Sequence, residues 1–143
     1  ESYFRAIMLL SCTVESTLNN LVLLKVIQTN KLLVWERADL QRFSLRTLID
    51  WVSGIKIEKN RKFSLDYSKY PPKLNPPLIT LKDKETLLLL KDIRNDIAHC
   101  SYLTYDKNLR KDLIEEMINK VEPICNKLFE ELINLSEQNK KIK

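Results

Sequence analysis

The sequence contains one glycine and one histidine among its 143 residues, and both shortages narrow the choice of fold and chemistry. Tight β-hairpin turns and phosphate-cradling loops rely on glycine for positive φ angles. A sheet-rich fold and a glycine-rich nucleotide loop are therefore disfavoured, and composition by itself predicts an all-α chain. Hydrophobic residues make up 44% of the sequence and charged residues 30%, which is typical of a globular domain with its own core.

Cysteine is also sparse. Cys12, Cys100 and Cys125 are odd in number, widely spaced and set in apolar helical patterns, so we expect buried, reduced thiols. With a single histidine in the chain, these cysteines cannot supply a zinc site of usual spacing. The sequence thus predicts no metal and no cofactor.

Long uninterrupted hydrophobic runs are absent as well. The apolar stretches near residues 7–10 and 21–24 are interrupted by Glu15, Asn19, Asn20 and Lys25. We therefore expect no membrane span, no signal peptide and a cytoplasmic location. The net charge of +5 is compatible with a nucleic-acid partner, although many basic domains bind none.

What is present is apolar periodicity at steps of three to four residues, which predicts helices at about 2–33, 37–54, 83–100 and 107–138. The first helix has one face that we expect to be buried: Ile7, Leu10, Ser11, Val14, Leu18, Leu21 and Val22. Other apolar residues of this helix, such as Leu9 and Val26, fall outside that stripe and predict a second packed surface. The chain is predicted to be a single domain, 1–143, folded as an antiparallel bundle of four to five helices.

Two residues punctuate these helices. Gly54 stands where a C-terminal cap belongs, so the only glycine is expected to end the second helix. Pro123 lies inside the last helix and is expected to kink or restart it.

Between the second and third helices, residues 55–82 form a basic connector that ends in four prolines. It contains basic residues (Lys56, Lys59, Arg61, Lys62, Lys69 and Lys73) and the aromatic residues Phe63, Tyr67 and Tyr70, the aromatics lying among the later cations. Such a mixture can lay cations along a phosphate backbone and stack bases on rings, so the first four of these basic residues are candidate RNA contacts. The alternative is a solvated return segment whose aromatics pack on the bundle.

The helix at 83–100 carries the candidate chemistry. Asp83 is a plausible N-cap. The core-facing stripe is predicted to be Thr86, Leu89, Leu90, Ile93, Ile97 and Cys100. Arg94 and His99 then lie just beyond opposite edges of that stripe, roughly 140° apart around the helix. The outer face between them passes through Lys91, Asn95 and Ala98.

The run Arg94-Asn95-Asp96-Ile97-Ala98-His99 resembles the arginine–polar–x3–histidine signature of HEPN domains, many of which are metal-independent ribonucleases. The stretch 44–52 is similar to the second helix of several HEPN families. The resemblance implies an endoribonuclease in a toxin, antiviral-defence or CRISPR-type setting, with RNA as substrate and a composite site at a homodimer interface. It also allows an antitoxin or a larger defence complex as a partner.

The chemistry fits these residue types. A histidine can donate or accept a proton at neutral pH, and an arginine binds phosphate through two parallel hydrogen bonds. Arg94 and His99 are the predicted catalytic pair, and Asn95 and Asp96 are expected to orient the histidine or the phosphate. Lys91 is expected to border the cleft and contact RNA.

Two other interpretations stay open. The same face can serve a non-catalytic dimerisation or partner-binding domain, or the chain can regulate through nucleic-acid binding without cleavage. In HEPN toxins controlled by nucleotidyltransferase antitoxins, a tyrosine two residues after the histidine is the residue modified. Here that position is Ser101 and the nearest tyrosine is Tyr102, so this route of control is not expected.

Overall fold

The computed structural model describes residues 2–30, 43–57, 71–99 and 107–140, which form four helices and no strand. These helices are α1 (Ser2–Asn30), α3 (Leu45–Val52), α4 (Leu81–Ala98) and α5 (Lys107–Lys140). The predicted all-α fold is confirmed. The parts of the predicted first two helices at 31–33 and 37–42 lie outside the described residues.

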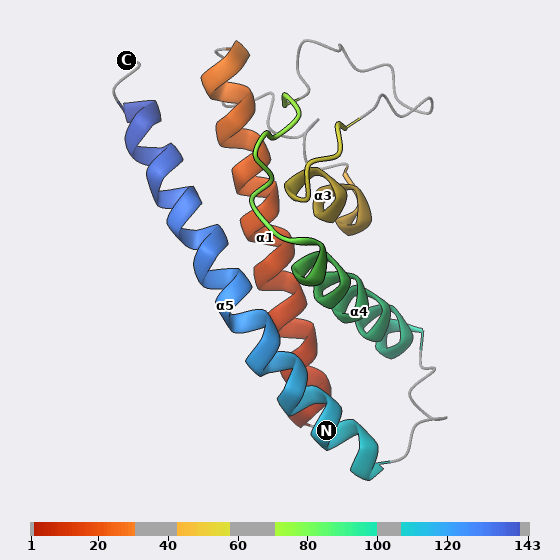
Figure 1. Cartoon of the computed structure of the whole chain (residues 1–143). Coiled ribbons are helices and arrows are strands. Elements are labelled where there is room, and N and C mark those ends of the chain that lie inside the picture. The colour runs from red at the N-terminus through yellow and green to blue at the C-terminus, as the bar shows by residue number, and fades with distance from the viewer. Residues whose placement is uncertain (1, 31–42, 58–70, 100–106, 141–143) are drawn as a thin grey trace.

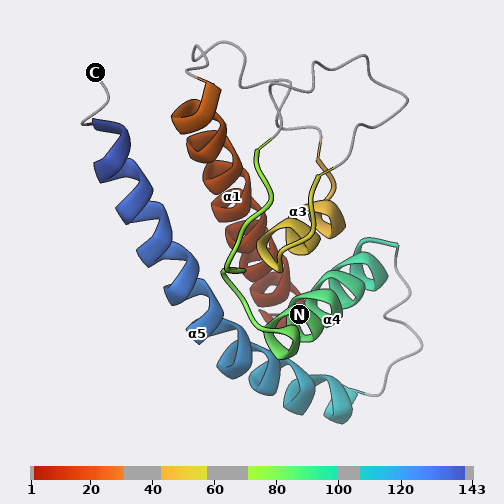
Figure 2. The ribbon, with the colours of Figure 1, turned by 45° about the horizontal axis from the view of Figure 1, so that its top comes forward.

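The two longest helices, α1 and α5, lie side by side and run in the same direction (Figures 1 and 2). Two hydrogen bonds join their C-terminal ends: Gln28 Nε2 donates to Gln138 Oε1 at 2.9 Å, and Asn139 Nδ2 donates to the carbonyl oxygen of Leu24 at 3.2 Å. The predicted helical bundle is thus present, with α1 and α5 as a parallel pair within it. The helix α4 packs against both of them and crosses the pair obliquely (Figures 1 and 2).

The core is built mainly from one face of α1 and one face of α5. On α1 the predicted stripe is buried, except that Leu10 is only partly buried. Val26 joins this stripe, whereas Leu9 remains 63% exposed. The fully or nearly buried positions of α5 follow the same helical spacing: Met117, Val121, Ile124, Leu128 and Leu135.

Pro123 does not restart α5, which continues from Lys107 to Lys140 and curves along the bundle (Figure 2). The ring removes one backbone donor, so the carbonyl of Asn119 loses its intrahelical partner. Both residues are exposed, and water can hydrate that carbonyl. The proline is thus tolerated on the solvent side of the helix.

Helix α3 is shorter than predicted because Ser44 caps it. The Ser44 hydroxyl accepts a hydrogen bond from the Thr47 backbone N–H at 3.2 Å, so the helix begins at Leu45 rather than at 37. At the other end Gly54 has a φ of 99°, and its backbone N–H donates to the Trp51 carbonyl. The backbone N–H of Ile55 donates to the backbone carbonyl of Asp50. This pair of bonds is a Schellman motif, and the predicted role of Gly54 is confirmed.

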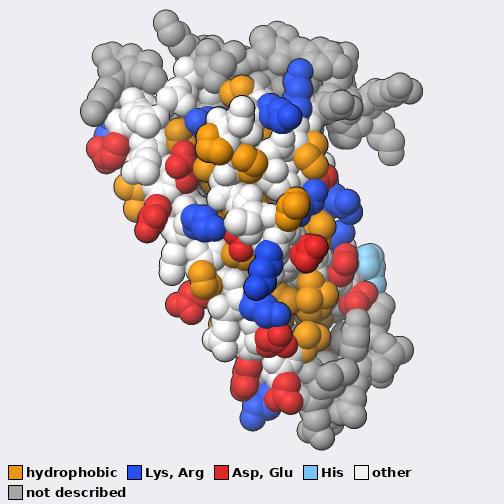
Figure 3. Space-filling view, viewed as in Figure 1, with side chains coloured by type: hydrophobic (Ala, Val, Ile, Leu, Met, Phe, Trp, Pro, Cys, Tyr) orange, Lys and Arg blue, Asp and Glu red, His pale blue; other side chains and the backbone are white. Residues whose placement is uncertain are grey.

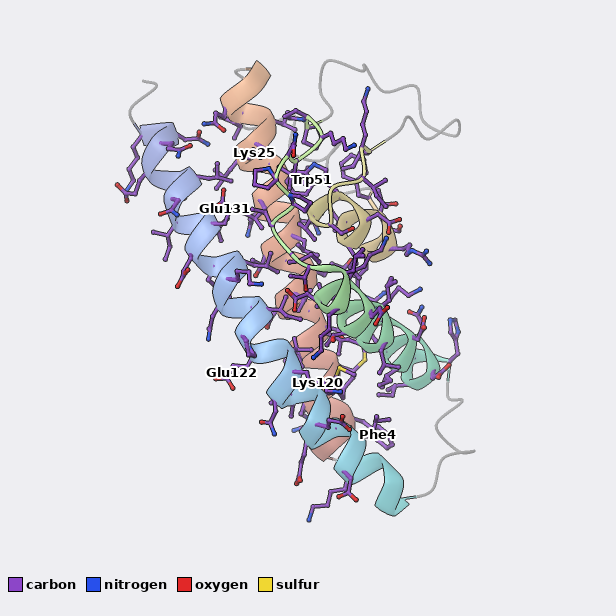
Figure 4. All side chains as sticks on the ribbon, in the orientation of Figure 1. Phe4, Lys25, Trp51, Lys120, Glu122 and Glu131 are labelled. Atoms are coloured by element: carbon purple, nitrogen blue, oxygen red, sulfur yellow. The ribbon has the colours of Figure 1, made fainter. Side chains whose placement is uncertain are left out.

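The proline-rich segment 71–80 packs along α3 and leads directly into α4. Trp51, labelled between α1 and α3 in Figure 4, is fully buried and donates from Nε1 to the Pro72 carbonyl at 3.1 Å. The Leu78 N–H donates to the Val52 carbonyl at 2.9 Å. Residues 71–80 contain no helix, as their prolines predict.

The cysteines behave differently from one another. Cys125 is buried, as expected, and burial raises the pKa of its thiol, with the negative charge of Glu122 adding to the effect. Cys12 is exposed, so the expectation of burial was wrong there. Its position lies on the side of α1 away from the core stripe. Cys100 lies outside the described residues.

By length and hydropathy, the stretch Phe4–Gln28 of α1 is long and apolar enough to cross a membrane, the single such helix in the described part of the chain. The core helix of a globular protein passes the same test. Here that stretch contributes the buried face that packs on α3, α4 and α5.

Candidate functional site

Helix α4 is rotated about its axis relative to the prediction: Leu90 of the predicted stripe is buried and Ile93 and Ile97 pack against the core, but the most buried side shifts towards Leu87. Leu87 and Leu90 are buried, whereas Leu89 is 46% exposed. Thr86, Ile93 and Ile97 are partly buried, and Cys100 lies outside the described residues. The predicted stripe was therefore wrong in its centre: on a helical projection, Arg94 lies on the buried side with Leu87 and Leu90 rather than at the border of the outer face.

The helix begins one turn earlier than predicted, and Thr80 rather than Asp83 is its N-cap. The Thr80 hydroxyl accepts from the Asp83 N–H at 3.1 Å, and the Asp83 carboxylate accepts from the Thr80 N–H at 3.3 Å. This reciprocal pair is a capping box, with the carboxylate at the third helical position. Asp83 also accepts from Lys127 Nζ of α5 at 2.9 Å, and Lys84 pairs with Asp50 of α3 at 3.2 Å.

The pKa of Asp83 is shifted by these contacts. Burial by itself would raise it, but the hydrogen bonds from Lys127 and from Thr80, together with the charge of Lys127, outweigh burial. The pKa of Asp83 consequently lies below its ordinary value, and the carboxylate is held in its charged form at neutral pH.

The side chain of Arg94 points to α1. Its Nη1 lies 2.6 Å from Glu15 Oε2, and the two side chains are 23% and 35% exposed. The other terminal nitrogen, Nη2, makes a long hydrogen bond of 3.4 Å to Asn95 Oδ1. A partly screened guanidinium held by a short charge-assisted bond is a fixed cation with unused donors, because arginine has five N–H groups.

His99 is the C-cap residue of α4 and is exposed at the surface (Figure 3). Its backbone N–H donates to the Asn95 carbonyl at 3.0 Å, which fixes the end of the helix. The imidazole therefore lies at the C-terminal end of α4, beside the last carbonyl groups of the helix. Arg94 and His99 are not brought together within one chain.

The neighbouring candidates lie around this end of the helix. Asn95 and Asp96 are half-buried. Lys91 is only 18% exposed and pairs with the exposed Asp92 at 3.1 Å, so its ammonium group is neutralised by its neighbour in sequence. Lys91 thus lies one turn before Asn95 on α4, and its positive charge is already in an ion pair with Asp92.

Of the four candidate RNA contacts in the connector, the structure describes only one. Lys56 is exposed, and Lys59, Arg61 and Lys62 lie outside the described residues. On the face drawn in Figure 3, basic, acidic and hydrophobic side chains are interspersed among the described residues rather than gathered by type. No cluster of three histidine, cysteine or acidic side chains suited to a metal occurs in the described ranges.

No known protein family, no curated protein and no solved structure matches this chain. The function is therefore inferred from the residues of the chain and their geometry.

One residue of the site was missed at the level of sequence. Glu15 is the only acidic residue between positions 2 and 30, and it lies at the edge of the core stripe. A half-buried carboxylate requires a cationic partner, so its position was a usable signal. The sequence could not say which of many lysines and arginines would supply the partner.

Proposed function

We propose that this chain is a metal-independent endoribonuclease of HEPN type, with Arg94 and His99 as its catalytic residues. The observation that supports the proposal most is the pairing, on one helix end, of an exposed histidine with an anchored arginine five residues earlier. The motif resemblance supplies the reaction class. The setting, a cytoplasmic toxin or defence system, rests on that resemblance alone.

The two side chains suit cleavage of a phosphodiester by the neighbouring ribose hydroxyl. The imidazole of His99 takes or returns a proton, and solvent access lets it exchange that proton between turnovers. The guanidinium of Arg94 stabilises the negative charge that grows on the phosphate oxygens. Asn95 and Asp96 lie on the same helix end and orient the scissile group. The reaction then needs no metal ligand.

The separation of the two residues calls for a second copy of the chain. Arg94 faces α1 while His99 faces solvent, so a single chain splays them apart. Packing of two α4 C-terminal ends about a two-fold axis places the Arg94 of one copy near the His99 of the other. The homodimer is thus part of the proposal, with RNA lying along its interface and the connector lysines contacting the phosphate backbone.

A second candidate is a non-catalytic helical module that binds a partner or dimerises through the same surface. The ion pair between Arg94 and Glu15 favours it, because tying two helices together is what a structural arginine does. In this alternative His99 only caps α4.

The deciding experiment incubates the purified protein with a fluorescently labelled single-stranded RNA in EDTA. Cleavage by the wild type, lost in both Arg94→Ala and His99→Ala, is the expected result. Lys120→Ala serves as the matched control, because it removes a cation from an exposed ion pair on α5. Absence of cleavage by a folded dimer over a wide range of protein concentrations would leave the non-catalytic module as the conclusion.

A mixing experiment tests the shared site. When the inactive Arg94→Ala and His99→Ala chains are combined and allowed to exchange, each mixed dimer carries one intact composite site. Activity should return to about a quarter of the wild-type level, because about half of the dimers are mixed and each has one of its two sites intact. No recovery despite proven subunit exchange would contradict a site shared in this way.

A further inference from the structure

The strongest cross-helix contact at the candidate site is the bond between Glu15 Oε2 and Arg94 Nη1, at 2.6 Å. It joins residues 79 positions apart in the sequence and ties the C-terminal half of α4 to α1. From position 91 to position 98 of α4 every side chain is at least partly exposed. The ion pair is therefore a principal fixed point of this helix end.

We propose that Glu15 is the positioning residue that aligns the Arg94 guanidinium for the phosphate; this inference rests on the ribonuclease proposal above. A free arginine side chain samples many rotamers and loses that freedom when it binds its ligand. Glu15 restricts this freedom before RNA arrives. The electrostatic contribution to catalysis depends on donors that are oriented in advance.

The geometry leaves donors for a substrate. Glu15 engages the Nη1 side of the guanidinium, and Asn95 takes one long bond from Nη2. The Nε–H group donates to no described residue, and each terminal nitrogen carries a second hydrogen. A phosphate can thus approach the free side of the guanidinium while Glu15 holds the other side.

The surroundings of Glu15 fit a fixed carboxylate. Ser11 lies one helical turn before it on the same face of α1 and is fully buried. The Ser11 hydroxyl oxygen has no hydrogen-bond partner among the described residues. The carboxylate of Glu15, one turn further along, is partly screened from water and is held by its short bond to Arg94.

The proposal makes the two residues one functional unit, which a double-mutant cycle measures. In the EDTA assay, Glu15→Ala should lower kcat about 10- to 100-fold, the effect expected when a charge-assisted hydrogen bond is lost from the reacting arrangement. Because Arg94→Ala is expected to be inactive, the cycle uses Arg94→Lys, which keeps a cation, and the double variant Glu15→Ala/Arg94→Lys should be no slower than Arg94→Lys alone. A carboxylate with a merely structural role would lower activity additively.

Glu15→Gln provides the conservative rescue and keeps the test decisive if the alanine variant fails to fold. The amide oxygen still accepts from Nη1 but without charge, so kcat should fall by no more than about 10-fold, with KM for RNA nearly unchanged. Glu116→Gln is the matched control, because it removes the same charge from an exposed ion pair with Lys120 on α5. That control should cleave like the wild type.

Each result is distinguishable. Glu15 variants that equal or exceed the wild type, while Arg94→Ala is inactive, overturn the positioning role and leave the ribonuclease proposal standing. Increased activity in Glu15→Gln would assign Glu15 as a restraint that competes with phosphate. A folded wild type whose RNA cleavage does not depend on Arg94 overturns both proposals together.

Discussion

The two ends of α4 are built on different principles. At the N-terminal end a capping box, two cross-helix ion pairs and the buried Leu87 and Leu90 fix the helix to α3 and α5. At the C-terminal end every described side chain is at least partly exposed, and the ion pair of Arg94 with Glu15 reaches across to α1. The first end stabilises the fold, and the second end holds side chains where a ligand can reach them.

This division has a physical reason. A buried apolar side chain contributes stability but cannot meet a substrate, whereas a catalytic group must be reachable and still held in place. Anchoring one end of a helix firmly allows the other end to carry polar groups without loss of the fold. Substitutions along α4 should therefore affect stability at the N-terminal end and, under the proposed function, RNA cleavage at the C-terminal end.

The largest effect on stability is expected from Leu87→Ala. Leu87 is fully buried, so the variant loses about 2–5 kcal/mol through lost apolar burial and the cavity left behind. Leu89→Ala is the matched control, because Leu89 is 46% exposed and its loss should cost under about 1 kcal/mol. Urea unfolding followed by circular dichroism measures both. Equal losses in the two variants would contradict the orientation of α4 described above.

Removal of the N-cap should have the next largest effect. Thr80→Ala leaves the Asp83 backbone N–H without its acceptor and should lower the free energy of unfolding by about 1 kcal/mol. Thr80→Ser keeps the hydroxyl and should retain most of the stability. A Thr80→Ala protein as stable as the wild type would show that the capping box adds nothing beyond solvent hydration of that N–H.

The ionised carboxylate of Asp83 should add somewhat less to the free energy of unfolding than the Thr80 cap does. It adds stability only at pH values at which the carboxylate is charged. Because its pKa is lowered in the folded state, the ionised carboxylate stabilises the fold above its ordinary pKa of 3.8. This contribution is lost as the pH falls through the folded-state value. Asp83→Asn should therefore lose about 0.5–1 kcal/mol at pH 7 and match the wild type in strong acid, as measured by unfolding at a series of pH values. A difference independent of pH would assign the effect to hydrogen-bond geometry instead of charge.

The smallest change in stability is expected at the other end of the helix. His99→Ala removes an exposed imidazole and should alter the free energy of unfolding by less than about 0.5 kcal/mol. If the proposed function holds, the same substitution abolishes RNA cleavage. Thermal unfolding and the EDTA cleavage assay on one preparation measure both quantities. A large loss of stability would place His99 among the structural residues.

Much of the fold was predictable because it depends on local pattern. The period of apolar residues in α1 gave its buried face, since every third or fourth side chain of a helix must share a side. Gly54 was identifiable as a cap because only glycine adopts a φ of 99° without strain. The four prolines similarly excluded helix from 71–80.

The arrangement of α4 was less predictable because it is amphipathic only in part. Its four consecutive leucines, residues 87–90, cover every direction around the helix, so periodicity did not determine which of them faces the core. The choice depends on the directions in which α1, α3 and α5 approach, and that is a property of the tertiary structure. This rotation moved Arg94 from the predicted border of the outer face to the side that meets α1.

The sequence alone determined the all-α class, the helix-ending role of Gly54 and the five-residue spacing of Arg94 and His99, because these follow from composition and neighbouring residues. Only the tertiary structure decided that α1 and α5 run parallel, that Leu87 rather than Leu89 is buried, and that Glu15 meets Arg94. The physical reason is that an ion pair across 79 residues exists only after packing has placed two helices side by side.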